Sequence, residues 1–137
     1  MARFAQNLIS LTEQKPSILF LSASSAVFDT IPEECFTMYN FHLLKITPKN
    51  SINERISNKD LVIIDTYSLG VDFLDKVSEM TAGLKIPILI IDDFNDQIII
   101  GKMFDKGAKG YLNIDEYGDL LKSKIQKLIP KLGMMIL

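Results

Sequence analysis

The sequence predicts an α/β fold in which helices cover both faces of a five-stranded parallel sheet. Apolar runs of strand length alternate with segments of helical periodicity, which is the pattern of repeated strand–helix–strand units. Three of the runs are almost continuous Ile, Leu and Val, as expected for strands that are buried on both faces. The predicted strands are Ser17–Ser22, 41–47, Leu61–Asp65, Ile88–Asp92 and Gly110–Asn113.

The second strand is more polar than the others because it contains His42 and Lys45. We therefore expect it to lie at an edge of the sheet. His42 is the only histidine, and no cysteine lies near it in the sequence, so it cannot anchor a zinc site. A solvated residue on an edge strand is the simpler interpretation of His42.

The first two predicted helices are short. Thr30, Pro32 and Glu33 match a capping box, in which a Thr precedes a Glu by three residues and Pro is tolerated in the first turn. This helix is expected to extend to about Tyr39. A second short helix is predicted over residues 51–57.

Three longer helices follow. Apolar residues at a spacing near 3.6 predict a helix over 71–81. A helix over 96–106 should end at Gly107, which can adopt the left-handed conformation. Asp115 is predicted to cap the last helix, and Pro130 to end it. The apolar face of that helix would consist of Tyr117, Leu120, Leu121, Ile125, Leu128 and Ile129.

The length of 137 residues predicts one domain with two short additions. We assign residues 16–130 to the α/β domain and residues 1–15 to an N-terminal helical extension. Residues 131–137 form an apolar tail, which should pack against its own domain or a second copy, because an exposed apolar tail would be adhesive.

Composition narrows the function classes. The net charge is −2 and contains no clustered positive block, so we expect no direct nucleic-acid binding. No apolar run is long enough to cross a bilayer. Cys35 is the only cysteine, so no internal disulfide can form, which suits a reducing cytoplasm. We expect its side chain to pack in the core as a small apolar group. A basic stripe formed by Lys122, Lys124, Lys127 and Lys131 is interpreted as a solvated helix face, with an acidic partner as the alternative.

The most informative residue is Asp65, which ends a strand of the predicted sheet. Open α/β sheets place their functional groups at the carboxyl ends of the strands. Asp92 and Asp93 end another strand, so Asp65, Asp92 and Asp93 should lie at one edge. We favour the interpretation that these carboxylates accept hydrogen bonds from nearby backbone amides, as turn and cap residues do. A cation site and a phosphoacceptor site are the alternatives.

Three segments together resemble the receiver domain of bacterial response regulators, the CheY-like fold. They are Asp60-Leu61-Val62-Ile63-Ile64-Asp65 with Gly70, then Ile86-Pro87-Ile88-Leu89-Ile90-Ile91, then Gly107-Ala108-Lys109-Gly110-Tyr111-Leu112. Their order and spacing carry the resemblance, which covers about residues 16–130. It implies a flavodoxin-like three-layer sandwich with strand order 2-1-3-4-5.

The resemblance implies that Asp65 occupies the phosphoacceptor position, but the residues that assist phosphorylation are missing. The family's acidic pair, which holds Mg²⁺, falls on Ser22 and Ala23. Its Ser or Thr after the fourth strand falls on Asp92, and its Lys after the fifth strand falls on Ile114. A phosphoryl group on Asp65 would lack its metal and its counter-charge, so the chain resembles an atypical receiver, or pseudo-receiver.

We therefore expect a non-enzymatic interaction module in signal transduction or transcriptional regulation that works without phosphorylation. No cofactor is expected, and no metal. Tyr111 falls at the family's aromatic switch position and is either held in one rotamer or an ordinary strand aromatic. Met103, Tyr111, Tyr117 and the tail are the expected contacts with a protein partner, and a homodimer is plausible.

Two other functions remain open. Asp65 could be a working phosphoacceptor of a two-component phosphorelay, in which case Mg²⁺ would be required. Alternatively, the chain could be a flavodoxin-like enzyme or small-ligand binder that uses the same edge of the sheet.

Overall fold

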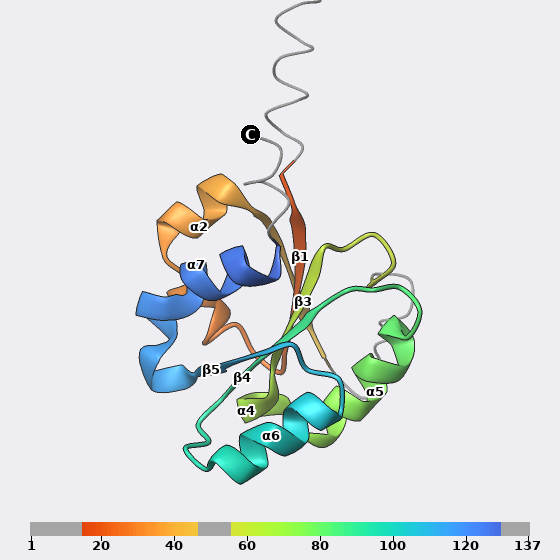
Figure 1. Cartoon of the computed structure of the whole chain (residues 1–137). Helices are drawn as coiled ribbons and strands as arrows, with labels where there is room; N and C mark the ends of the chain where they lie inside the picture. Colours follow the sequence, from red (N-terminus) through yellow and green to blue (C-terminus); the bar gives the residue numbers. More distant parts are fainter. Residues whose placement is uncertain (1–14, 47–55, 130–137) are drawn as a thin grey trace, which may run out of the picture.

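A three-layer α/β sandwich is formed by residues 15–46 and 56–129, which are the residues that the computed structural model describes (Figure 1). The middle layer is a parallel sheet with the order β2-β1-β3-β4-β5, which confirms the predicted fold class and strand order. The strands are β1 (Ser17–Ser22), β2 (Asn40–Lys45), β3 (Leu61–Asp65), β4 (Ile88–Asp92) and β5 (Gly110–Asn113).

Burial differs between the central strands and the edge. Every residue of β3 and β4 is buried, in keeping with their continuous apolar sequences. In β2, by contrast, Asn40, His42 and Lys45 are exposed. The prediction that this strand lies at an edge is therefore confirmed.

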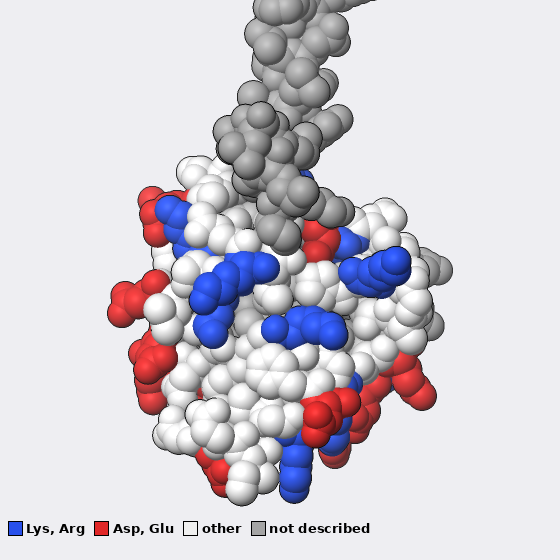
Figure 2. Space-filling model, viewed as in Figure 1, with Lys and Arg blue, Asp and Glu red and all other residues white. Residues whose placement is uncertain are grey.

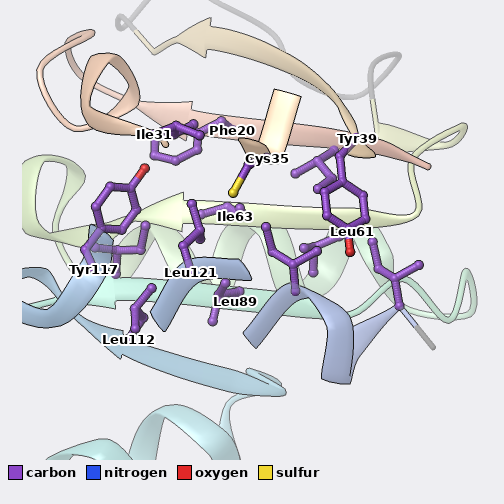
Figure 3. Packing of buried hydrophobic residues seen from close by; sticks show 14 residues of the cluster. Phe20, Ile31, Cys35, Tyr39, Leu61, Ile63, Leu89, Leu112, Tyr117 and Leu121 are labelled. Carbon is purple, nitrogen blue, oxygen red and sulfur yellow. The ribbon is translucent and has the colours of Figure 1, made fainter. Parts of the chain in front are cut away.

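Helices cover both faces of the sheet. Alternate strand residues point to opposite faces, so β1 sends Ile18 and Phe20 to one side and Leu19 and Leu21 to the other. The first side packs against α2 (Glu33–Met38) and α7 (Tyr117–Leu128), as Figure 3 shows for Cys35, Tyr117 and Leu121. The second side packs against α5 (Asp72–Thr81) and α6 (Gln97–Asp105).

The start of the first helix differs from the prediction. A 3-10 turn, η1 (Phe28–Thr30), precedes α2, and Pro32 occupies the N-cap position. Thr30 does not cap α2, because it ends the preceding 3-10 turn and the helix begins only at Glu33. The predicted capping box is therefore wrong. The Thr30 hydroxyl instead donates to the Val27 carbonyl at 2.6 Å, a bond that Thr often makes to a carbonyl three residues earlier.

The start of the last helix also differs. A second 3-10 turn, η2 (Ile114–Glu116), comes first, and the Asn113 side chain accepts a hydrogen bond from the Asp115 amide at 2.8 Å. Asp115 makes no side-chain cap of α7, so that prediction is wrong. On α7 itself, Leu121 and Ile125 are buried as predicted, whereas Leu120 is 37% exposed.

The other helices lie within one residue of their predicted bounds, and Gly107 after α6 has the expected positive φ of 116°. Cys35 is fully buried, and burial raises the pKa of its thiol. Most of the helix predicted at 51–57 lies outside the described residues, as do the N-terminal extension up to residue 14 and the tail. Within the described segments, no helix has both the length and the apolar character of a membrane span.

Candidate functional site

The two strand-end aspartates lie at the carboxyl edge of the sheet, as predicted. Asp65 ends β3, Asp92 ends β4, and these two strands are paired with Asp65 opposite Ile91. Both side chains are buried, with exposed fractions of 1% and 5%. Buried carboxylates require hydrogen-bond partners, because an isolated charge is costly to remove from water. The partners of each therefore decide what each carboxylate can do.

Asp65 is surrounded by neutral donors. Its Oδ2 accepts hydrogen bonds from the Ser22 hydroxyl at 2.8 Å and from the Ser68 hydroxyl at 2.9 Å. Its Oδ1 accepts from the Ser68 amide at 3.2 Å. Both carboxylate oxygens are thus occupied by groups of the chain itself. Ser22, which was aligned with a metal-binding acid of the receiver family, therefore carries a hydroxyl that donates a hydrogen bond to Asp65.

Ser68 belongs to a short helix that was not predicted from the sequence. Asp65 is the N-cap residue of α4 (Thr66–Leu69), which ends at Gly70 with a φ of 92°. The Ser68 hydroxyl also accepts a hydrogen bond from the Ala23 amide at 3.1 Å, so it joins the loop after β1 to the end of β3. The signals were an Asp before a short polar segment and a Gly after it, which are ordinary start and stop residues of a helix.

Asp92 has different partners. Its Oδ2 accepts a hydrogen bond from the Thr66 hydroxyl at 2.6 Å, and its Oδ1 accepts one from the Asp93 amide at 2.8 Å. Burial raises the pKa of Asp92; the bonds from Thr66 and the Asp93 amide oppose this rise, whereas the Asp93 carboxyl adds to it. Asp65 and Asp92 therefore share no hydrogen-bond donor. Both accept bonds from nearby backbone amides, as the favoured interpretation expected.

The three aspartates do not assemble into a cation site. Among the described residues, no group of three or more His, Cys, Asp or Glu side chains could hold a metal ion. The expected carboxylate cluster of Asp65, Asp92 and Asp93 is therefore not formed in a metal-binding arrangement. The reason is that Asp65 turns to Ser22 and Ser68, whereas Asp92 turns to Thr66.

Ile114 places an apolar side chain beside the aspartate. Together with Asp65, it lines a cavity of about 550 Å³ at the carboxyl edge of the sheet. Ile114 is partly buried and packs against the core on the side of α2 and α7. No ammonium group is thus supplied to Asp65 from the end of β5.

The predicted switch and contact residues lie in two kinds of environment. The Tyr111 hydroxyl donates to the Phe94 carbonyl at 2.8 Å, and burial raises the pKa of Tyr111 to about 12. Met103 is only 4% exposed and Tyr117 only 3%. Both belong to the core, so neither lies on the surface where we expected a partner contact. Each lies on the apolar stripe of its helix, and that stripe faces the sheet.

No family model matches the sequence, and no curated protein matches it. Solved structures do match. A response regulator from Thermotoga maritima is 18% identical, with a TM-score of 0.70 over 85% of this chain and 98% of the other. A receiver domain from Clostridium thermocellum is 17% identical, with a TM-score of 0.69 over 88% and 98%. The HemR receiver domain from Leptospira biflexa is 16% identical, with a TM-score of 0.63 over 84% and 94%.

The chain has the receiver-domain fold. Since the identities lie between 16% and 18%, the likeness is one of fold, and it does not transfer the activity of those proteins. Around Asp65 lie the Ser22 and Ser68 hydroxyls, and the apolar side chain of Ile114 lines the same cavity.

Proposed function

We propose that this chain is a pseudo-receiver: a signalling module without enzymatic activity that acts through protein contacts and does not depend on phosphorylation. The observation that supports this proposal is the environment of Asp65. Its carboxylate accepts three hydrogen bonds, all from Ser22 and Ser68, and none of these donors carries a charge.

Charge makes phosphorylation of this site unfavourable. A phosphoryl group adds between one and two negative charges, and phosphoryl transfer relies on cations to offset charge on the transferred group. Among the described residues that line the cavity beside Asp65, there is no Lys or Arg. A phosphoryl group would also displace the Ser22 and Ser68 hydroxyls from Oδ2. It would therefore lose existing bonds without gaining a counter-charge.

The best candidate for a contact surface is the face formed by α6, β5 and α7. Figure 2 shows lysine side chains gathered on this face. A groove of about 310 Å³ on it is lined by Phe104 and Tyr111 together with Lys109, Lys124 and Lys127. Aromatic groups that provide burial, surrounded by cations, suit a protein partner with acidic side chains around an apolar centre.

Met103 and Tyr117 are buried, so we expect exposed apolar side chains to make the contacts on this face. Phe104 is 42% exposed and Leu120 is 37% exposed. Ile98, at the start of α6, is 71% exposed. A second copy of the chain is one possible partner. The tail at 131–137 lies outside the described residues, so its part in pairing stays a prediction.

The phosphorylation claim is tested by incubating the full chain with acetyl phosphate and Mg²⁺ and measuring its intact mass. We expect no gain of a phosphoryl group, in the native chain or in Asp65→Asn. A gain in the native chain that is absent from Asp65→Asn would show that Asp65 is a working phosphoacceptor, and the proposal would be wrong.

The contact face is tested by light scattering over a range of concentrations. If the chain pairs through this face, Phe104→Asp should weaken self-association about tenfold or more. The reason is that a ring which the interface would bury is replaced by a charge. Phe36→Asp is the matched control: Phe36 is 40% exposed, compared with 42% for Phe104, and it lies on α2, which is not part of this face. Monomeric native protein at every concentration would exclude the homodimer and leave an acidic partner of another kind.

A further inference from the structure

The cavity beside Asp65 has the dimensions of a binding site for a small molecule. It measures about 550 Å³, within the range of roughly 300–1,000 Å³ found for such sites. It opens between the loop after β1, the helix α4, and the start of α7. The described residues that line it are Ser24, Ala26, Val27, Thr30, Asp65, Tyr67, Ser68, Ile114, Tyr117 and Gly118.

Most of its lining is hydrocarbon. Val27 and Ile114 are partly buried and pack against the core, and the Tyr117 side chain is almost completely buried. Tyr67 is 57% exposed, so its ring is available to a bound molecule. Apolar walls with a few polar groups are typical of sites that enclose small organic molecules. The occupant should therefore have a mainly apolar body.

Tyr117 provides an incomplete polar group at this cavity. Its hydroxyl is buried and has no hydrogen-bond partner among the described residues. Burial raises the pKa of Tyr117, and the Thr30 side chain lowers it. The Thr30 hydroxyl donates its own proton to the Val27 carbonyl. Buried hydroxyls without a partner are uncommon and cost free energy. The geometry thus leaves one donor to be satisfied beside the cavity.

Asp65 sets the charge that the cavity favours. It contributes a carboxylate whose described donors are all neutral, and no Lys or Arg is among the described lining residues. In a site with restricted water, such a carboxylate attracts a cation or a hydrogen-bond donor and repels an anion. The exposed ring of Tyr67 adds a face on which a cation is also favourable.

We propose that this cavity binds a small alkyl amine with an apolar body, which lies against Val27 and Ile114. Its protonated amine donates to Asp65 Oδ1, which accepts only one hydrogen bond from the described residues and can therefore accept another. This inference goes beyond the proposed function, because a protein-interaction module requires no ligand. It also has an independent test, since amine binding can be absent while the chain still resists phosphorylation.

The test uses three probes with the same ring: 2-phenylethylamine, 2-phenylethanol and phenylacetate. Each is titrated into the full-length, ¹⁵N-labelled chain while amide shifts are recorded. The amine should cause saturable shifts at Ser24, Tyr67 and Gly118, and phenylacetate should bind at least about tenfold more weakly. The alcohol should lie between them. Equal binding of the amine and phenylacetate, or no saturable shift with the amine, would overturn the proposal.

A charge placed in the cavity sharpens the test. Ile114→Lys should weaken binding of 2-phenylethylamine about tenfold or more, because an ammonium would then compete for Asp65. Ile114→Met, of similar size without charge, should keep the affinity within about threefold. If Ile114→Lys loses its dispersed amide spectrum, Ser24→Lys on the exposed loop replaces it with the same expectation. If a folded lysine variant binds the amine as tightly as the native chain does, Asp65 does not hold the amine and the proposal is wrong.

Discussion

The carboxyl edge of the sheet has two sides that treat their polar groups differently. On the side of β4 and β5, Asp92 is bonded to Thr66 and the Tyr111 hydroxyl to the Phe94 carbonyl. On the side of β1 and β3, Asp65 is bonded by serines, but the Tyr117 hydroxyl has no partner among the described residues. A cavity is found beside Asp65. On the first side both of these polar groups are hydrogen-bonded, and the pocket beside Tyr111 measures about 270 Å³. The second side combines the larger cavity, of about 550 Å³, with a buried hydroxyl that has no described partner.

The largest expected effect separates the two aspartates. Asp65→Ala should destabilise the chain by about 2–3 kcal/mol, since three donors, two serine hydroxyls and the Ser68 amide, would lose the carboxylate. The Ser22 and Ser68 hydroxyls would keep only longer contacts of 3.2 Å, to each other and to the Asp65 carbonyl. Asp92→Ala should cost only about 1 kcal/mol, because the Thr66 hydroxyl keeps the Ile91 carbonyl at 3.1 Å as an acceptor. Urea unfolding of both variants measures the difference. An equal loss of unfolding free energy in both variants would show that the hydrogen bonds of Asp65 stabilise the chain no more than those of Asp92.

A smaller difference is expected between the two tyrosines. Tyr111→Phe removes a hydroxyl that donates at 2.8 Å, so it should destabilise the chain by about 1 kcal/mol. Tyr117→Phe removes a buried hydroxyl that has no described partner, so it should be neutral or stabilise by up to about 1 kcal/mol. Thermal or urea unfolding distinguishes them. A substantial loss of stability in Tyr117→Phe would mean that its hydroxyl is satisfied in the folded chain.

The smallest expected effect is a dependence on pH that originates at Asp92. Its pKa is raised above 3.8 in the folded chain, mainly by burial, with Asp93 as the facing charge. The folded state therefore binds a proton more tightly than the unfolded state does. This proton binding stabilises the folded state fully below the pKa that Asp92 has in the unfolded chain. The stabilisation is lost as the pH rises through the higher pKa that Asp92 has in the folded chain.

Asp92→Asn should remove this dependence. Its free energy of unfolding, measured by urea at several pH values from about 4 to about 7, should fall less with rising pH than that of the native chain. Asp93→Asn is the matched control, because it removes the facing charge and keeps the buried carboxyl. A native and an Asp92→Asn chain with parallel pH profiles would contradict the raised pKa.

The sequence was sufficient for the sheet because each strand carries its own signal. Nearly continuous apolar residues in β1, β3 and β4 indicate the central strands, and the more polar residues of β2 indicate that this strand lies at an edge. Asp65 and Asp92 were also found, because strand ends are predictable once the strands are known.

The details of the site were less predictable, because they depend on contacts between residues that are distant in the sequence. Ser22 and Asp65 are 43 positions apart, and only the pairing of β1 with β3 brings them together. Thr30 and Asp115 were assigned as caps from local patterns, but each lies in a 3-10 turn and the helix after it begins further along the chain. Met103 and Tyr117 were expected to contact a partner, but their side chains face the sheet and are buried. Which side of α6 and α7 faces the sheet depends on packing between distant residues.

The central claim is that the surroundings of Asp65 cannot hold an additional anion. The most direct measurement is a titration of the ¹⁵N-labelled chain with Mg²⁺ and beryllofluoride, which imitates a phosphoryl group on a carboxylate. A variant with Ser22→Asp, Ala23→Asp, Asp92→Thr and Ile114→Lys serves as the comparison. We expect the amides of Ser68 and its neighbours to shift in that variant and to stay unchanged in the native chain. Saturable shifts at these amides in the native chain would contradict the claim.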